Sequence, residues 1–173
     1  YPAYTITCYV VLFGVVTTHL RTRAQVERLL WSIAIIGVLV GVYSWAQSYG
    51  HDVLTLNEIP NGSKSGSTLG NSILAGSVLL MTTTICVATA TIAVNGPVRS
   101  ARFWGMLGLW TCILTLQITA LIFISSRGSW AACIAALVVL LGLTALFLRW
   151  RFILRMAVVL GTAAGLSAAL VMH

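Results

Sequence analysis

Acidic side chains are almost missing from this chain. Only three of its 173 residues are Asp or Glu, and all charged residues together make up 8% of the sequence, against about a quarter in a typical soluble domain. Hydrophobic residues make up 59%. A chain with so much apolar and so little charged surface must turn much of it toward lipid, and we therefore predict a polytopic helical membrane protein.

The three acids, Glu27, Asp52 and Glu58, all lie between the long apolar runs and none lies within one. Proton- and cation-coupled transporters usually place an acid near the middle of the membrane, and a Mg²⁺ site needs carboxylates. The chain also lacks a Gly-rich loop followed by Lys and Ser or Thr, which ATP hydrolysis would need. We therefore expect neither a metal ion nor a cofactor.

Cysteine chemistry is also scarce, because the chain has no CxxC motif and no Cys/His cluster. The four cysteines are widely spaced, and each lies in an apolar run: Cys8, Cys86, Cys112 and Cys133. We interpret them as small apolar residues of helix packing, without a disulfide framework or a metal site.

Long apolar runs are what the sequence has in abundance. A helix needs about 20 apolar residues to cross a hydrocarbon core of about 30 Å. Six runs qualify: residues 3–20, 29–49, 69–95, 103–124, 129–148 and 152–171. They are twice as long as barrel strands and do not alternate. The fold class is therefore predicted to be all-α, a single transmembrane bundle of about six spanning helices over residues 1–173.

Two pairs of glycines have the spacing that allows helices to approach closely. They are Gly37 with Gly41 and Gly161 with Gly165. We interpret both pairs as packing positions within one bundle.

Basic residues gather on alternate loops. Eight of the ten lie in the first, third and fifth loops, and the second and fourth hold only Lys64 and Arg127. By the positive-inside rule the odd loops face the cytoplasm, and the even loops and both chain ends face outside. The net charge of +7 is confined to these short loops, so we expect no nucleic-acid partner.

The chain begins at Tyr1 inside an apolar run and ends at His173 directly after another. The first run has no charged leader and no cleavage site, so it is not a signal peptide. We expect a segment of a larger membrane protein. The one sizeable loop, residues 50–68, is rich in Gly and Ser, and we expect it to be more mobile than the helices.

Arg127 stands apart from the other arginines, in a predicted four-residue turn on the outer side. A guanidinium at a membrane is costly unless an anion meets it, although it could also simply reach out to the headgroups. Hydroxyls of Ser125 and Ser126 flank it, and Gly128 would open the turn so that N–H groups of the next helix face a ligand. An arginine beside a helix N-terminus is an anion site, and its planar fork suits phosphate.

These residues resemble a known family. The stretch ITALIFISSRGSW at 118–130 looks like the Ser-Arg-Gly helix of the O-antigen ligase and O-antigen polymerase family. The stretch GSTLGNSILAG at 66–76 resembles the segment in which members of that family have a Gly-Asn-Pro motif, and Ser72 stands here in the place of the Pro. The order of these motifs along the chain also matches. The resemblance covers most of the chain, from about Tyr43 onward.

The resemblance implies a bacterial inner-membrane enzyme with both ends of this segment on the periplasmic side. Such enzymes transfer a glycan from undecaprenyl diphosphate to an acceptor hydroxyl of a glycan or lipid, without a metal. Arg127 would bind the diphosphate as the catalytic residue, with Ser125, Ser126, Gly128 and Asn71 as substrate-binding candidates. The family's large external loop, which carries a second Arg and a His, lies beyond this chain, and His173 is not that His.

Two other functions stay open at this point. One is a transporter or flippase for an anionic lipid or solute, with Arg127 as gate or substrate contact. The other is a membrane scaffold without catalysis. A large external loop with Arg and His in the adjoining sequence would favour the transferase, and a second set of helices in inverted order would favour transport.

Overall fold

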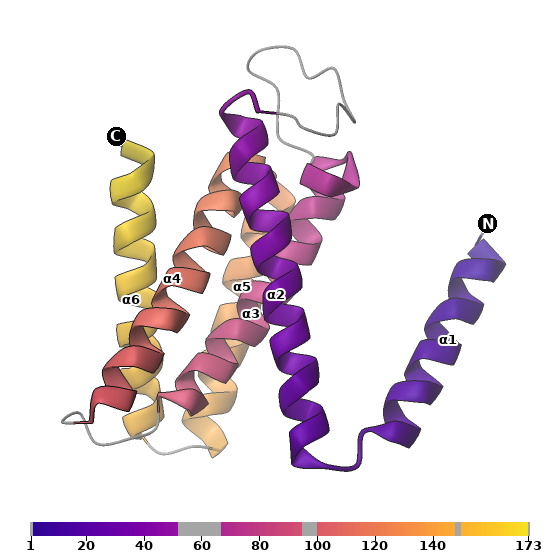
Figure 1. Cartoon of the computed structure of the whole chain (residues 1–173), viewed down its shortest axis with the longest axis horizontal. Coiled ribbons are helices and arrows are strands. Elements are labelled where there is room, and N and C mark those ends of the chain that lie inside the picture. Colours follow the sequence, from indigo (N-terminus) through magenta and orange to yellow (C-terminus); the bar gives the residue numbers. More distant parts are fainter. Residues whose placement is uncertain (1, 52–66, 95–99, 148–149, 173) are drawn as a thin grey trace. The chain divides into compact units, whose positions relative to one another are not determined.

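The computed structural model describes residues 2–51, 67–94, 100–147 and 150–172, and all its regular structure is helical. The helices are α1 (Pro2–His19), α2 (Arg23–Ser48), the 3-10 helix η1 (Ser67–Leu69), α3 (Ser72–Ala93), α4 (Ala101–Ile124), α5 (Arg127–Phe147) and α6 (Trp150–Met172) (Figure 1). The described ranges contain no strand, which confirms the all-α fold class.

Five of these helices, α2 to α6, are long and apolar enough to cross a membrane, and α1 adds a shorter apolar stretch, Ile6–His19. The chain is therefore a multi-pass membrane protein. Two helices differ in extent from the predicted spans. Helix α2 begins at Arg23, six residues before the predicted start, and the third predicted span divides into η1 and a shorter α3. The predicted mobile loop falls almost wholly outside the described residues.

The chain forms two compact units, Tyr1–Ser32 and Ile33–His173. In the first, a short turn joins α1 to the start of α2. Thr22 and Gln25 form a capping box there: the Thr22 hydroxyl accepts from the Gln25 N–H at 3.3 Å, and the Gln25 side-chain oxygen accepts from the Thr22 N–H at 2.9 Å. This pair satisfies two N–H groups that a helix start leaves open, which explains why α2 begins before its apolar run.

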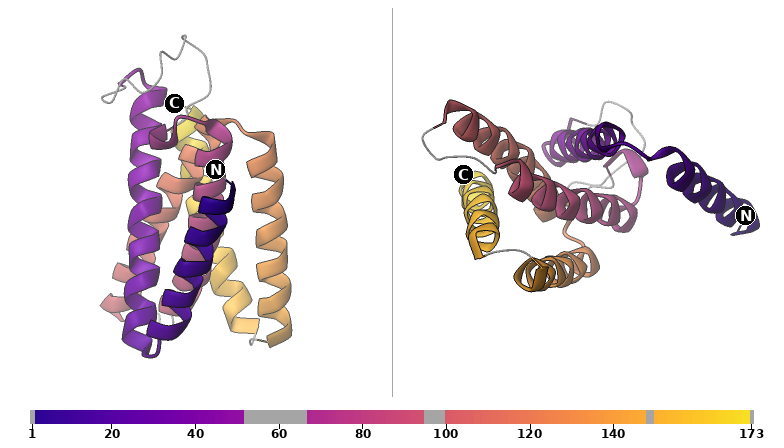
Figure 2. Two further views of the ribbon diagram at one scale, coloured as in Figure 1. Left: turned by 90° about the vertical axis from the view of Figure 1, so that its right-hand side faces the viewer. Right: turned by 90° about the horizontal axis from the view of Figure 1, so that it is seen from below.

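In the second unit α3 contacts α4, α5 and α6, and α4 also packs along α6. The N-termini of α3 and α5 lie at one end of this unit, and the N-termini of α4 and α6 lie at the other (Figure 1). We call these the Arg127 end and the Arg155 end. A view along the helices shows α6 beside α4 (Figure 2). Buried apolar side chains from these helices, with Ala34 and Val40 of α2, form two core clusters.

A buried polar side chain, Gln117 of α4, links α4 to α3. Its amide oxygen accepts a hydrogen bond from the Thr83 hydroxyl at 3.0 Å, and its amide nitrogen lies 3.7 Å from the Cys86 sulfur. In lipid such groups must find partners within the protein. Gly37 of α2 leaves room for this pair, because a Cβ there would collide with the Gln117 side chain.

The four glycines of the predicted packing pairs have different surroundings. Gly37 faces Gln117, and a Cβ at Gly41 would lie 3.7 Å from Ala120, so the first pair is confirmed as a close contact. The prediction for Gly161 and Gly165 was wrong, because a Cβ at either would have no described atom within 4 Å. Their sides of α6 face away from the neighbouring helices.

Helix η1 is attached to α2 through a single buried residue, Ser67. Its N–H donates to the Gln47 side-chain oxygen at 2.8 Å, and its hydroxyl donates to the Val40 carbonyl, also at 2.8 Å. The φ angle of Ser67 is 51°, in the left-handed region that non-glycine residues seldom adopt. The two buried hydrogen bonds offset that backbone cost.

Candidate anion-binding site at the turn between α4 and α5

The turn before Arg127 is shorter than predicted. Helix α4 ends at Ile124 and α5 begins at Arg127, so only Ser125 and Ser126 connect them. Ser125 takes the left-handed conformation, with φ 51° and ψ 31°, and its N–H donates to the Ile122 carbonyl at 3.1 Å. The turn is thus opened by Ser125. Gly128 lies inside α5, so the prediction that Gly128 opens the turn was wrong.

Ser126 forms the N-cap of α5. Its carbonyl accepts the Trp130 N–H at 3.1 Å, and its hydroxyl accepts from the Ser129 hydroxyl at 3.2 Å. Ser126 is only 8% exposed. Its side chain is therefore buried at the start of α5, where it bonds to Ser129, and does not face the solvent.

The first turn of α5 lies tightly against α3. A Cβ at Gly76 of α3 would collide with the Ser129 hydroxyl and come within 2.8 Å of the Ser129 Cβ. The Ile124 side chain closes the same contact from the end of α4, at 3.6 Å from the Cβ position. Gly76 therefore sets the position of the helix start that carries Arg127.

Arg127 is exposed and is the first residue of α5. Within the described residues its guanidinium has no hydrogen bond and no ion pair. A helix N-terminus already carries a partial positive charge, and an anion there gains about 0.3–1 kcal/mol. An arginine adds charge of the same sign, so this position is electrostatically unfavourable until an anion binds.

A cavity of about 460 Å³ opens beside Arg127 and is lined by Ile122, Ser125, Arg127 and Trp130. Of the predicted site residues, Arg127 and Ser125 thus share one cavity, whereas Ser126 is buried and Gly128 is not among the lining residues. Trp130 was not among the predicted site residues. Its position three residues after Arg127, on the same face of a helix, could have indicated it.

Asn71, the remaining predicted site residue, lies at the Arg127 end but outside that cavity. It is the N-cap of α3, and its side-chain oxygen accepts the Ile73 N–H at 2.8 Å. Asn71 stands five residues before Gly76, which corresponds to about 7.5 Å along a helix. The two motifs of the sequence therefore meet at one end of the bundle through Gly76 and Ser129.

The arrangement is suited to binding a phosphate-type anion at a membrane surface. It combines a guanidinium that has no partner among the described residues, a helix N-terminus, an exposed serine hydroxyl and an indole ring. Comparisons with protein-family models, with curated proteins and with solved structures found no match for this chain.

Proposed function

We propose that the full-length protein transfers an oligosaccharide from undecaprenyl diphosphate to an acceptor hydroxyl at the Arg127 end of the bundle, on the periplasmic side of a bacterial inner membrane. The observation that carries the proposal is Arg127 itself: exposed, at a helix N-terminus and without a counter-charge in the described structure. The resemblance of the Ser-Arg-Gly stretch to O-antigen ligases supports the same assignment.

In this reaction the acceptor hydroxyl oxygen forms a new bond to the sugar and gives up its proton to the departing diphosphate, and the bond between the sugar and the diphosphate breaks. The bonding electrons leave with the diphosphate, so negative charge grows on its oxygens. A positioned donor or cation that meets such charge contributes about 2.7–4 kcal/mol to catalysis. Arg127 would supply it, and the two fork nitrogens of its guanidinium would hold two phosphate oxygens at once.

The neighbours of Arg127 have supporting roles in this proposal. The first N–H groups of α5 would donate to the remaining phosphate oxygens. The exposed Ser125 hydroxyl, which donates to the Ile122 carbonyl at 3.4 Å, would have to turn away from that carbonyl to join them. Trp130, 43% exposed, would form an apolar wall at the depth where the prenyl chain meets its diphosphate. The apolar faces of the bundle would keep that chain in lipid.

Replacing Arg127 with Lys tests the proposal in the full-length protein with purified lipid-linked donor. Lysine keeps the charge but loses the planar fork. We expect glycan transfer to fall tenfold or more, which corresponds to about 1.4 kcal/mol or more of lost transition-state stabilisation. Expression and thermal stability should not change, because both side chains reach the interface.

Arg102→Lys is the matched control, since Arg102 is also an exposed residue of the first helical turn, on α4. This variant should transfer glycan at the wild-type rate. A wild-type rate in Arg127→Lys would reject the diphosphate role of Arg127. Movement of the intact lipid-linked donor across vesicles, without transfer, would instead support the flippase alternative.

A further inference from the structure

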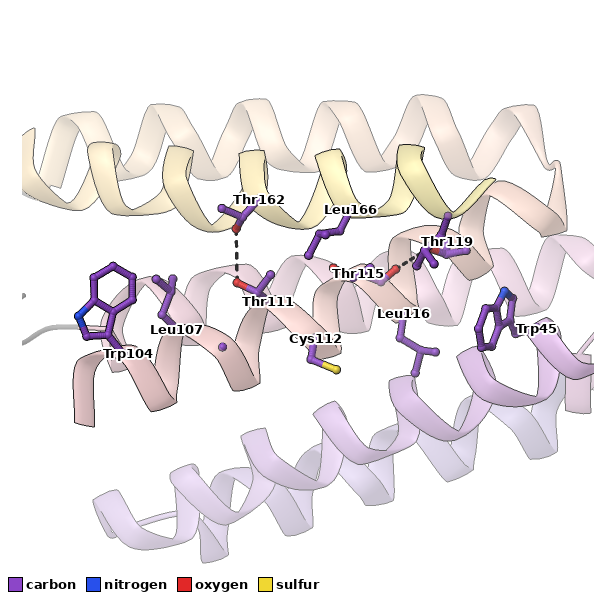
Figure 3. A pocket seen from close by; sticks show the side chains of 12 residues that line it. Trp45, Trp104, Leu107, Thr111, Cys112, Thr115, Leu116, Thr119, Thr162 and Leu166 are labelled. Carbon is purple, nitrogen blue, oxygen red and sulfur yellow. Dashed lines mark hydrogen bonds between the residues drawn. The ribbon is translucent and has the colours of Figure 1, made fainter. Parts of the chain in front are cut away.

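A groove of about 700 Å³ runs between α4 and α6 and shares no lining residue with the cavity beside Arg127. Figure 3 shows Trp104 at one end of this groove and Trp45 of α2 at the other, with Thr111 and Cys112 between them. From Trp104 to Thr119 the groove follows fifteen residues of α4, which is about 22 Å of helix. That length exceeds half of a hydrocarbon core of about 30 Å, so a lipid chain of one leaflet fits in it lengthwise.

The groove is apolar in spite of its threonines, because their hydroxyls are already bonded. Thr111 and Thr162 share a hydrogen bond at 3.3 Å across the two helices. Thr119 donates to the Thr115 carbonyl at 2.8 Å, and Thr162 donates to the Val158 carbonyl at 2.9 Å. The groove therefore offers methyl and methylene groups to a guest, which suits a hydrocarbon chain.

Arg155 is not among the lining residues, but helix geometry places it near the mouth of the groove, at the end that Trp104 lines. Helices α4 and α6 run in the same direction (Figure 1), and the bond between Thr111 and Thr162 places these two residues at one height. Seven residues earlier on each helix stand Trp104 and Arg155, at similar height and rotated by only about 20°. The half-buried Arg155 guanidinium lies over the Phe152 ring, 5.6 Å from its centre.

The charge around this mouth has one sign. In the described part of the chain, the first two turns of α4 and α6 contain no acid, and the exposed Arg102 and the half-buried Arg155 lie in them. Basic residues near a membrane surface attract anionic lipids with about 1 kcal/mol each. A zwitterionic headgroup would gain much less, so the charge favours an anionic occupant.

We propose that this groove binds one acyl chain of an anionic phospholipid, whose phosphate lies against Arg155 and Trp104. The lipid comes from the leaflet at the Arg155 end, opposite to the leaflet of the donor lipid, so this site is additional to the proposed transferase site. The Trp104 indole, 59% exposed, would lie at the headgroup level, where tryptophan is enriched in membrane proteins.

Native mass spectrometry tests this site on the full-length protein in mild detergent, titrated with phosphatidylglycerol or phosphatidylcholine of equal chain length. We expect tighter binding of phosphatidylglycerol. Arg155→Gln should weaken it about fivefold, to the level of phosphatidylcholine, since about 1 kcal/mol corresponds to that factor. Arg102→Gln removes an exposed charge from α4 beside the groove mouth and should have a much smaller effect.

The chain part of the site has its own pair of variants. Gly108 lines the groove, whereas Gly105, also on α4, does not, and a Cβ at either position would meet no described atom within 4 Å. Gly108→Phe should fill the groove and abolish retention of both lipids, and Gly105→Phe should preserve it. Thermal melting of each variant verifies that the fold is kept.

Several results would overturn the proposal. They are equal binding of the two lipids, an Arg102→Gln effect as large as that of Arg155→Gln, and undiminished phosphatidylglycerol binding in Gly108→Phe. Competition by glycerol phosphate alone would also reject it, because it would assign the site to a free phosphate. None of these measurements depends on glycan transfer, so they can fail while the transferase proposal stands.

Discussion

The contact between Gly76 of α3 and Ser129 of α5 supports a quantitative prediction. In Gly76→Ala the new methyl group would collide with the Ser129 hydroxyl and lie within 2.8 Å of its Cβ. The Ser129 Cβ is fixed to the backbone of α5, so it cannot move away without the helix itself. Extra atoms in a packed contact cost about 1–3 kcal/mol, and for a chain of this size each kcal/mol lowers the melting temperature by roughly 2–4 °C.

The same geometry predicts a rescue. Ser129→Gly removes both close atoms and leaves Ile124, at 3.6 Å, as the nearest partner of the new methyl group. Ser129→Gly alone should cost about 1 kcal/mol, because it loses the hydrogen bond to Ser126 and adds a glycine to a helix. The double variant should lose less stability than the two single variants lose together. The difference, the coupling energy, should be at least about 0.5 kcal/mol.

Thermal melting of the purified protein in one detergent measures all three variants. Gly165→Ala is the control, since a methyl group there meets no described atom within 4 Å, and it should melt at or slightly above the wild-type temperature. If Gly76→Ala melted like Gly165→Ala, the tight approach of α3 and α5 would be refuted. If the double variant lost as much stability as the two single variants together, the methyl group introduced at position 76 would not be in contact with residue 129.

Two further predictions concern the bundle interior and its orientation. Thr83→Val keeps the side-chain shape but takes away the donor to Gln117, and it should lower the unfolding free energy by about 0.6–1.7 kcal/mol; an unchanged value would mean that Gln117 finds another donor. In a cysteine-free background, Ser63→Cys should react with an impermeant thiol reagent on intact cells, and Ser100→Cys only after permeabilisation. The reverse pattern would invert the membrane orientation predicted from the arginines.

Helix positions were predictable where composition changes sharply. The apolar run of α4 stops at the serines of the turn, and its predicted end, Ile124, is the observed one. The start of α2 was missed because its first turns carry charge, although the pair Thr22 and Gln25 could have indicated it. The start of α3 was missed because Leu69 reads as part of an apolar run, whereas Asn71 ends the irregular segment by capping the helix.

The sequence was enough to identify Arg127 as the central residue of the candidate site, but not to predict how the turn around it is built. Arg127 is conspicuous because it lies apart from the other arginines, and a local pattern is enough to find it. Gly128 was expected to open the turn, whereas Ser125 takes the left-handed conformation there, and its side chain and N–H both donate to the Ile122 carbonyl of α4. The glycine pairs at 37 and 161 have equal spacing, yet only the first touches a neighbour. The spacing of residues in the sequence predicts which of them share a helix face, but it does not predict whether another helix packs against that face.

The polar contacts between helices have a consequence for how the chain enters the membrane. Ribosomes make the N-terminal helices first, and each buried polar link joins a later residue to an earlier one. Ser67 finds Val40 of α2, Gln117 finds Thr83 of α3, and Ser167 donates to the Thr115 carbonyl of α4 at 3.1 Å. A helix leaving the translocon therefore meets its polar partner already in the membrane, so insertion in the order of synthesis lets each later group pair as soon as its own helix enters.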